Sequence, residues 1–308
     1  MPQKSVRVLL RGGLGNQLFQ YGAGFALSKK LGVDLILDPR LMPKVESTGS
    51  GVSTWPVQLG EFDHFGSIVQ GNSNQSGSST FRARLMQLDR SIGDRIPSQL
   101  AKLGRFSNET NAHIEHFFAI KSNNSVINSY CNSSEYFLNH GDEIRGSIRE
   151  LRNPSTNFQE LTQEALKEKP LAVHIRLGDY RNLSHIYGRF DPEYVREAIN
   201  VQFALSGERP VWLFSDDPDL ALGLTRHIGH RLETQPAQDR VSALETMLIM
   251  SKCNGLVASN SSFSWWAGYL SESLESKIIF PRPFFAPTGP EEPKDWLLPS
   301  WIQIGRAL

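Results

Sequence analysis

Cysteine is almost absent from this chain of 308 residues, which contains only Cys131 and Cys253. Two cysteines cannot build a disulfide framework, and neither is flanked by a CxxC pair or by the spacing of a zinc site. We therefore expect both thiols to be buried and to pack as small hydrophobic side chains.

An excess of either charge is also absent, because 32 basic side chains balance 32 acidic ones. A net charge of zero gives no long-range attraction for nucleic acid, which is not expected as a partner. No segment approaches the roughly 18 apolar residues of a membrane span, and the N-terminal apolar stretch is too short for a signal peptide. These absences predict a cytoplasmic protein without a membrane span, and leave peripheral contact with the inner membrane open.

The chain does contain apolar β-type runs that alternate with helical stretches. "SVRVLL" (5–10), a helix that ends at Gly32, and "VDLILD" (33–38) form a β-α-β start. A polar loop is expected over 46–80 and a helix over 81–92. Strands of the second half are expected at 171–177, 211–216, 255–260 and 277–280. The alternation predicts the α/β class with two Rossmann-like domains, residues 1–155 and 156–308.

A glycine turn, "GGLGNQ", follows the first expected strand. Gly13 and Gly15 match the start of a dinucleotide fingerprint, and Asp38 ends the next strand at the distance of a ribose-binding acid. The third glycine of that fingerprint is Leu18, which argues against an NAD(P)-dependent oxidoreductase. A plain turn before a tightly packed helix is a second interpretation. We favour a third, in which the loop amides and Asn16 face a ligand and Asp38 only ends its strand.

A second motif, "HIRLGDY", ends an apolar run in the middle of the chain. Side chains alternate along a strand, so His174 and Arg176 are expected on one face, and Ile175 and Leu177 in the core. Ligands of open α/β sheets bind at the carboxyl ends of strands, and a guanidinium grips phosphate with two hydrogen bonds. The alternative is an ion pair between Arg176 and Asp179 that ties the loop.

Acidic residues follow the next strand, in "FSDDPDL". Asp217 and Asp219 have the spacing of a metal-binding DxD pair, but Asp217 precedes Pro218, as at the start of a helix, where acids are favoured. We expect no metal there, and we place Asp217 among the residues that line the ligand site.

The stretch "ASNSSFSWWAGYL" predicts a strand, a hydroxyl-rich turn and a helix. Ser261 and Ser262 can donate to an anion beside the free amides of the helix start, and one of them is expected to cap the helix. Trp265 and Trp266 are expected to pack this helix on the sheet.

Taken in their order along the chain, the motifs described above resemble those of the α-1,2-fucosyltransferase family, whose members use GDP-fucose. The resemblance rests on "GGLGNQLFQYGAG", "VHIRLGDY" and "ASNSSFSWWAGYL", with support from "LFSDDP" and "WLLPSW". It implies two Rossmann-like domains facing a cleft (the GT-B type), no metal and no cofactor besides the donor. It also implies inverting transfer of L-fucose from GDP-β-L-fucose to the 2-hydroxyl of a terminal galactoside, in a bacterial surface glycan.

The family pattern assigns Arg176 to the β-phosphate of the donor. This fits the chemistry, because departure of GDP leaves charge on that phosphate and a site without metal needs a cation there. The other residues that the resemblance places around the donor are Gly13, Gly15, Asn16, His174, Asp179, Tyr180, Ser261 and Ser262.

Two positions depart from the family pattern. A second arginine usually follows the first, and here it is Leu177, which the alternation turns away from Arg176. An aspartate expected near the guanine is replaced by Thr246, and whether Glu245 or Thr246 takes that role stays open.

The catalytic base has three candidates, Asp179, His185 and Asp191, of which Asp191 precedes Pro192 and is better explained as a helix cap. Asp179 is preferred, as the base or as the group that orients Arg176. A non-catalytic nucleotide- or sugar-binding protein and the oxidoreductase stay as alternative functions.

Overall fold

The computed structural model describes residues 4–42, 56–69, 105–106, 114–235, 238–271, 277–290 and 295–307. These residues form two compact units, the first running to residue 150 and also including 295 and 296, and the second comprising 151–290 and 297–307. The second unit thus begins shortly before the expected boundary at residue 156. The helix expected over 81–92 lies outside the described residues.

The first unit is built on a parallel sheet with the strand order β3-β2-β1-β5-β4. Chain order reverses between β1 and β5, which both pair with their neighbours in parallel. The β-α-β start is confirmed, whereas β5 was not expected, and β3 lies inside the stretch expected to be a polar loop. The strands are β1 (Ser5–Leu9), β2 (Asp34–Asp38), β3 (Ser67–Ile68), β4 (Arg105–Phe106) and β5 (Asn124–Ile127).

Helix α1 (Leu14–Leu31) is buried along most of its length. A side chain at Gly24 would place its Cβ atom 2.4 Å from the side chain of Val8, so the small residues of this helix allow close packing on β1. The helix ends at Gly32, whose φ of 62° lies in the left-handed region, as expected. The remaining helical segments of this unit are η1 (Pro39–Leu41), η2 (Leu59–Glu61), α4 (Ile114–Phe118), η3 (Ser134–His140) and α5 (Gly141–Arg149).

The second unit contains another parallel sheet, with the strand order β10-β9-β8-β6-β7. Each expected strand of the second half is present, and β10 is an additional one. Chain order reverses between β6 and β8, so the gap between their carboxyl ends is the switch point where open α/β sheets bind ligands. The strands are β6 (Leu171–Ile175), β7 (Val211–Ser215), β8 (Leu256–Val257), β9 (Ile278–Arg282) and β10 (Ile302–Gly305).

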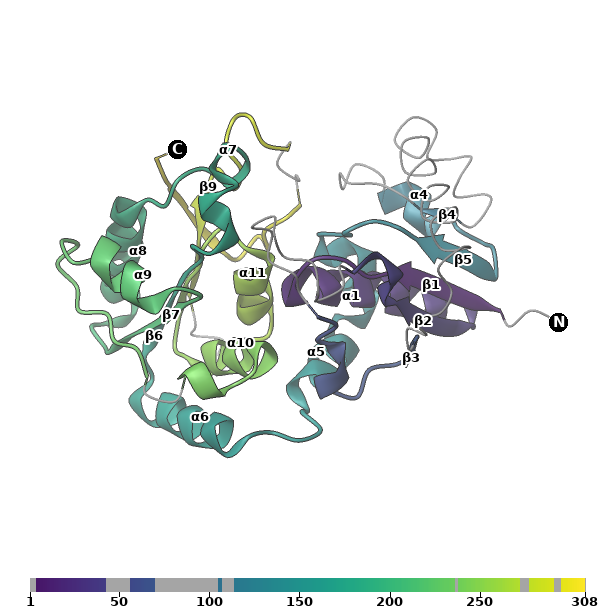
Figure 1. Cartoon of the computed structure of the whole chain (residues 1–308), viewed down its shortest axis with the longest axis horizontal. Helices are drawn as coiled ribbons and strands as arrows, with labels where there is room; N and C mark the ends of the chain where they lie inside the picture. The colour runs from purple at the N-terminus through teal and green to yellow at the C-terminus, as the bar shows by residue number, and fades with distance from the viewer. Residues whose placement is uncertain are drawn as a thin grey trace. The chain divides into compact units, whose positions relative to one another are not determined.

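Helices cover both faces of this second sheet, with α8 and α9 on one side and α10 and α11 on the other (Figure 1). Ile175 and Leu177 belong to the core shared with α8, as the alternation predicted. Trp265 and Trp266 of α11 are fully buried, also as expected. The helical segments are α6 (Thr156–Glu168), η4 (Asp179–Arg181), α7 (Ser184–Tyr187), α8 (Pro192–Ser206), α9 (Pro218–Leu224), η5 (Gln238–Arg240), α10 (Ala243–Lys252) and α11 (Ser262–Tyr269).

The predicted α/β class, with a parallel sheet in each half of the chain, is therefore confirmed. Cys131 and Cys253 are both buried and free, as expected, and burial raises the pKa of Cys131 to about 12. Within the described ranges, no helix combines the length and the apolar character needed to cross a bilayer.

Candidate functional site

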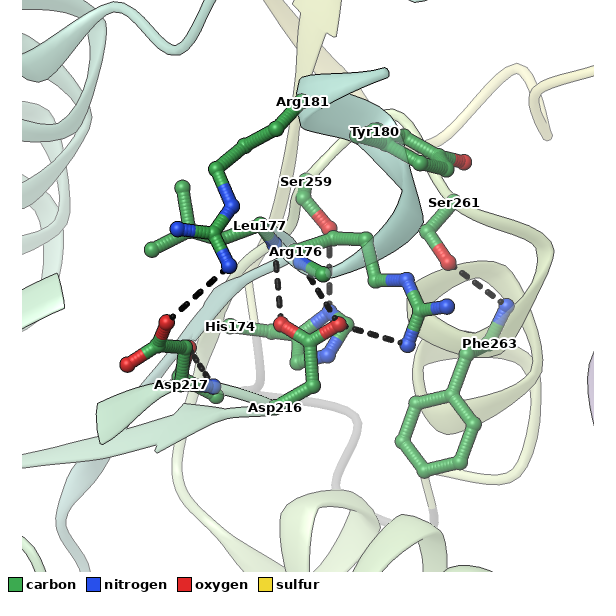
Figure 2. A network of polar contacts seen from close by, with 12 residues as sticks. His174, Arg176, Leu177, Tyr180, Arg181, Asp216, Asp217, Ser259, Ser261 and Phe263 are labelled. Carbon is green, nitrogen blue, oxygen red and sulfur yellow. Dashed lines mark hydrogen bonds and ion pairs between the residues drawn. The ribbon is translucent and has the colours of Figure 1, made fainter. Parts of the chain in front are cut away.

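The carboxyl edge of the second sheet brings residues from three parallel strands together (Figure 2). His174 and Arg176 come from the end of β6, Asp216 follows β7, and Ser259 and Ser261 follow β8. Because β6 lies between β7 and β8, these residues surround the switch point at which chain order reverses.

Arg176 forms an ion pair with Asp216. The distance from Nη1 of Arg176 to Oδ2 of Asp216 is 2.8 Å, and the two side chains are only 16% and 23% exposed. The guanidinium carbon lies 5.8 Å from the centre of the Tyr180 ring, within the range of a cation–π contact. Figure 2 shows the guanidinium pointing toward the start of α11. A permanent cation is thus held at the carboxyl edge of the sheet.

Asp216 is a partner of Arg176 that the sequence did not suggest, and the ion pair considered there, between Arg176 and Asp179, stays a prediction. Asp179 opens η4, and its side chain lies outside the described part of the structure. Asp216 was missed because it was treated only as the last residue of a strand. The available signal was its place at the carboxyl end of a strand that neighbours β6 in a parallel sheet.

His174 is buried and lies between two serine hydroxyls. Its Nδ1 atom is 3.0 Å from Oγ of Ser259 and 2.5 Å from Oγ of Ser264, and its ring centre is 5.3 Å from that of Phe263. Burial lowers the pKa of His174 to about 4, the negative charge of Asp216 opposes this shift and the positive charge of Arg176 adds to it. His174 is therefore neutral near pH 7, and it connects β6 to the start of α11.

The two serines expected to bind an anion occupy the first positions of α11. Ser261 is the N-cap, and its Oγ accepts a hydrogen bond from the N–H of Phe263 at 3.2 Å. Ser262 is the first helical residue and is partly accessible. The capping role expected for one serine is confirmed for Ser261. The positive end of the helix dipole gives this place an affinity for anions.

Asp217 lies at the start of a helix, as its position before Pro218 indicated. It is the N-cap of α9, its Oδ1 accepts from the N–H of Leu220 at 3.3 Å, and Oδ2 lies 3.5 Å from Nη2 of Arg181. These contacts make Asp217 a helix cap and a partner of Arg181, and its ligand-lining role stays a prediction. In the described part of the chain, no group of three or more histidine, cysteine, aspartate or glutamate side chains is arranged to hold a metal ion.

Glu245, one of the two candidates for the guanine contact, belongs to the start of α10. It forms a capping box with Ser242 at the start of α10, and its Oε2 accepts from the Ser242 N–H at 2.8 Å. Its Oε1 accepts from the N–H of Ser155 at 2.6 Å, and the residue is buried. The Thr246 hydroxyl donates to the Ser242 carbonyl at 2.9 Å. Both candidates for the guanine contact are therefore bonded to nearby backbone groups.

In the first unit, the glycine turn precedes α1 as predicted, and Gly13 is its N-cap. Gln17 ties the turn down, because its Nε2 donates to the carbonyls of Gly12 and Pro56, each at 3.0 Å. Asn16 is the one partly accessible residue in the otherwise buried stretch 14–28. Gly15 is buried inside the helix, whereas Gly13 and Asn16 are partly accessible, and the ligand-binding role of these residues stays a prediction.

Asp38 is confirmed as a strand-ending turn residue. Its carboxylate is buried and paired with Arg7 at 2.6 Å and with Arg40 at 2.5 Å, and it caps η1. Hydrogen bonds from these arginines outweigh the effect of burial and hold the pKa of Asp38 below its usual value. A carboxylate with two arginine partners is not available to a ribose, which argues against the oxidoreductase.

The two remaining candidate bases lie beyond β6. His185 is exposed on the short helix α7. Asp191 is the N-cap of α8 and accepts from the N–H of Glu193 at 3.0 Å, which confirms the capping role preferred for it.

A pocket of about 380 Å³ opens beside Arg176, within the size range of small-molecule sites. Its described charged lining comprises Arg176, Arg181, Arg189 and Arg306 against Asp191. This composition favours an anionic ligand at the same edge of the sheet.

Solved structures share this fold. NodZ alpha-1,6-fucosyltransferase co-crystallized with GDP superposes with a TM-score of 0.51 at 15% identity, covering 87% of this chain and 92% of that one. Fucosyltransferase NodZ from Bradyrhizobium gives a TM-score of 0.52 with the same identity and coverage. At this identity the likeness concerns the fold alone.

Two Escherichia coli proteins are similar in sequence. The O-antigen biosynthesis glycosyltransferase WbnK is 24% identical, over 96% of this chain and 99% of its own length. An alpha-1,2-colitosyltransferase is 25% identical, over 90% and 91% of the two chains. The profile of glycosyl transferase family 11 matches residues 5–305. Since this match spans nearly the whole chain, the protein is a glycosyltransferase and belongs to glycosyl transferase family 11.

Proposed function

We propose that this glycosyltransferase moves L-fucose from GDP-β-L-fucose to the 2-hydroxyl of a terminal galactoside, with inversion and without a metal ion. The observation that carries the proposal is the anchored cation of Arg176, which points toward the start of α11 at the switch point of the second sheet. A guanidinium fork and the positive end of a helix suit a diphosphate.

The proposed reaction is a single displacement at C1 of fucose. The acceptor oxygen forms a bond to C1 from the face opposite the diphosphate, the bond from C1 to the β-phosphate oxygen breaks, and GDP leaves with the electron pair. Arg176 stabilises the charge that develops on the β-phosphate, and the start of α11, with Ser261 and Ser262, holds the diphosphate. The acceptor proton passes to a base, for which Asp179 is the first candidate and His185 the second.

The relatives support the finer parts of this proposal. One is named for α-1,2 transfer and the other for O-antigen biosynthesis, in accordance with an α-1,2 linkage made in a bacterial surface glycan. The proposal keeps the cytoplasmic location expected from the sequence, and fractionation of cells that express the chain tests it.

A second candidate donor is the GDP-activated form of colitose, because one relative at 25% identity is an alpha-1,2-colitosyltransferase. Colitose is L-fucose without its 3-hydroxyl group. A site that hydrogen-bonds this hydroxyl rejects the deoxy sugar strongly, whereas a site that does not bond it discriminates little.

The test is a transfer assay with both donors and with a β-galactoside acceptor. We expect a higher kcat/KM with GDP-fucose, no transfer to the 2-deoxygalactoside, and an NMR spectrum of the product that shows an α-fucosyl group on the 2-oxygen. A higher kcat/KM with the colitose donor would select the second candidate. Another linkage, or hydrolysis without transfer, would overturn the acceptor assignment.

Arg176→Lys tests the role of the guanidinium. Lysine keeps the charge but loses the planar fork, so we expect turnover to fall about a hundredfold or more while the circular dichroism spectrum is unchanged. Turnover close to that of the wild type would return Arg176 to a purely structural role.

A further inference from the structure

The carboxylate of Asp216 forms one ion pair and accepts two backbone hydrogen bonds from the segment that follows β6 (Figure 2). Its Oδ2 lies 2.8 Å from Nη1 of Arg176 and accepts from the N–H of Gly178 at 3.0 Å. Its Oδ1 accepts from the N–H of Leu177 at 2.8 Å. One carboxylate thus holds both the arginine side chain and the backbone that carries it.

The sheet itself creates this arrangement. Ile175 of β6 is in register with Ser215 of β7, so Arg176 and Asp216 are the next residues along two paired strands. A Cβ atom at Gly178 would lie 2.4 Å from Oδ2 of Asp216, so glycine leaves the space that the carboxylate occupies. The contact therefore depends on Asp216 and on Gly178 together.

The neighbouring acid provides a comparison. Asp217 pairs with Arg181 at 3.5 Å, and the arginine side chain is 59% exposed. Exposed ion pairs of this kind contribute little, because solvent screens them and two long side chains must be ordered. The pair of Arg176 and Asp216 is shorter, more shielded and supported by two backbone N–H groups, so it can fix the direction of the guanidinium.

Asp216 also carries a negative charge beside the place proposed for a diphosphate. As a bystander it would repel the donor, and its removal would tighten nucleotide binding. A carboxylate at this position favours the reaction only if the benefit of orienting the guanidinium is larger than the repulsion between the carboxylate and the donor. The two interpretations therefore predict opposite changes in GDP affinity.

We propose that Asp216 is the positioning residue of Arg176, which it holds in the orientation that stabilises the departing β-phosphate of the donor. The inference rests on the proposed function, since it needs a diphosphate leaving group at this edge of the sheet. A fixed charge that requires no reorientation during the reaction contributes more than one that must be ordered.

The test is a double-mutant cycle of Asp216→Asn and Arg176→Lys, read by kcat, by KM for the donor and by GDP affinity from calorimetry. Alone, Asp216→Asn should lower kcat about tenfold or more, change KM less than about threefold, and leave GDP affinity unchanged or lower. In the Arg176→Lys background, which lacks a fork to orient, the same change should lower kcat less than about threefold and should raise GDP affinity. Equal losses of kcat in both backgrounds, or tighter GDP binding in both, would overturn the proposal.

Two further variants complete the design. Gly178→Ala displaces the carboxylate without removing it, should reproduce the loss of kcat, and takes the place of Asp216→Asn in the cycle if that variant does not fold. Asp219→Asn removes the same charge from an exposed position three residues away and should leave kcat and GDP affinity unchanged. If the wild type transfers no fucose, the proposed function fails. The changes in GDP affinity that Asp216→Asn causes, alone and in the Arg176→Lys background, still decide the role of Asp216.

Discussion

His174 shows how burial controls the chemistry of a single side chain. It sits one position before the core residue Ile175, between the hydroxyls of Ser259 and Ser264, and burial keeps its ring neutral despite the nearby carboxylate of Asp216. A neutral imidazole adds no charge to a diphosphate site, so the cation at this edge is supplied by Arg176. His174 acts there by joining β6 to the helix start that follows β8.

This neutral state predicts a loss of stability in acid. Above pH 6.5 the imidazole is neutral in both the folded and the unfolded chain; between pH 6.5 and about 4 only the unfolded chain binds the proton. Between pH 7.5 and 4.5, the free energy of unfolding of the wild type should therefore fall about 2 kcal/mol more than that of His174→Gln. Urea denaturation at the two pH values measures the difference, and equal losses in both proteins would show that His174 titrates normally in the fold.

Individual contacts were predictable from the sequence only where both partners are close along the chain. The alternation of side chains correctly placed Ile175 and Leu177 in the core. The sequence "NSS" correctly indicated that one of its serines caps a helix, and this serine is Ser261. The contact between Arg176 and Asp216 joins positions on separate strands, so it depends on strand order, which "HIRLGDY" does not encode.

Side chains that bond nearby backbone N–H groups cap the starts of α6, α8, α9, α10 and α11 in the second unit. Ser242 followed by Glu245 is the Ser-x-x-Glu pattern of a capping box, a signal that the sequence already contained. The strands β5 and β10 were missed because each is short and neither lies in one of the stretches that carried the resemblance. Sheet pairing, not local propensity, makes them strands.

The cap at the start of α8 leads to a prediction about stability. Asp191 accepts from the N–H of Glu193 at 3.0 Å and also from the N–H of Ala307 at 2.7 Å, so it joins the helix to the C-terminal segment. Asp191→Ala should lower the free energy of unfolding by about 1–2 kcal/mol, one contribution from the cap and one from the lost acceptor.

Glu193→Ala is the matched control, because its ion pair with Arg196 is exposed and its removal should change stability by less than about 0.5 kcal/mol. A stable Asp191→Ala protein that has lost transfer would instead make Asp191 the base.

Both sheets reverse their strand order beside the first strand of the unit, and in each unit a polar turn follows that strand. The turn after β1 leads into α1, whose first turn carries Asn16, while the segment after β6 carries Arg176. The α/β class followed from the alternation of strands and helices, but strand order did not. Only the order shows that the turn after β6, the acid after β7 and the serines after β8 share one edge.

The two units make separate contributions to the expected nucleotide preference of the intact chain. Arg176 and the start of α11 recognise a diphosphate, and the buried, paired carboxylate of Asp38 cannot receive the ribose of NAD. Calorimetry should therefore show no binding of NAD, and the proposed GDP-fucose donor requires GDP to bind at least about tenfold tighter than UDP. The affinity for GDP should be the same in excess EDTA, because Asp217 serves as a helix cap and as a partner of Arg181. Loss of GDP binding in EDTA, restored by Mn²⁺, would assign Asp217 and Asp219 to a metal site. Equal affinities for GDP and UDP would mean that the protein recognises the diphosphate and not the base.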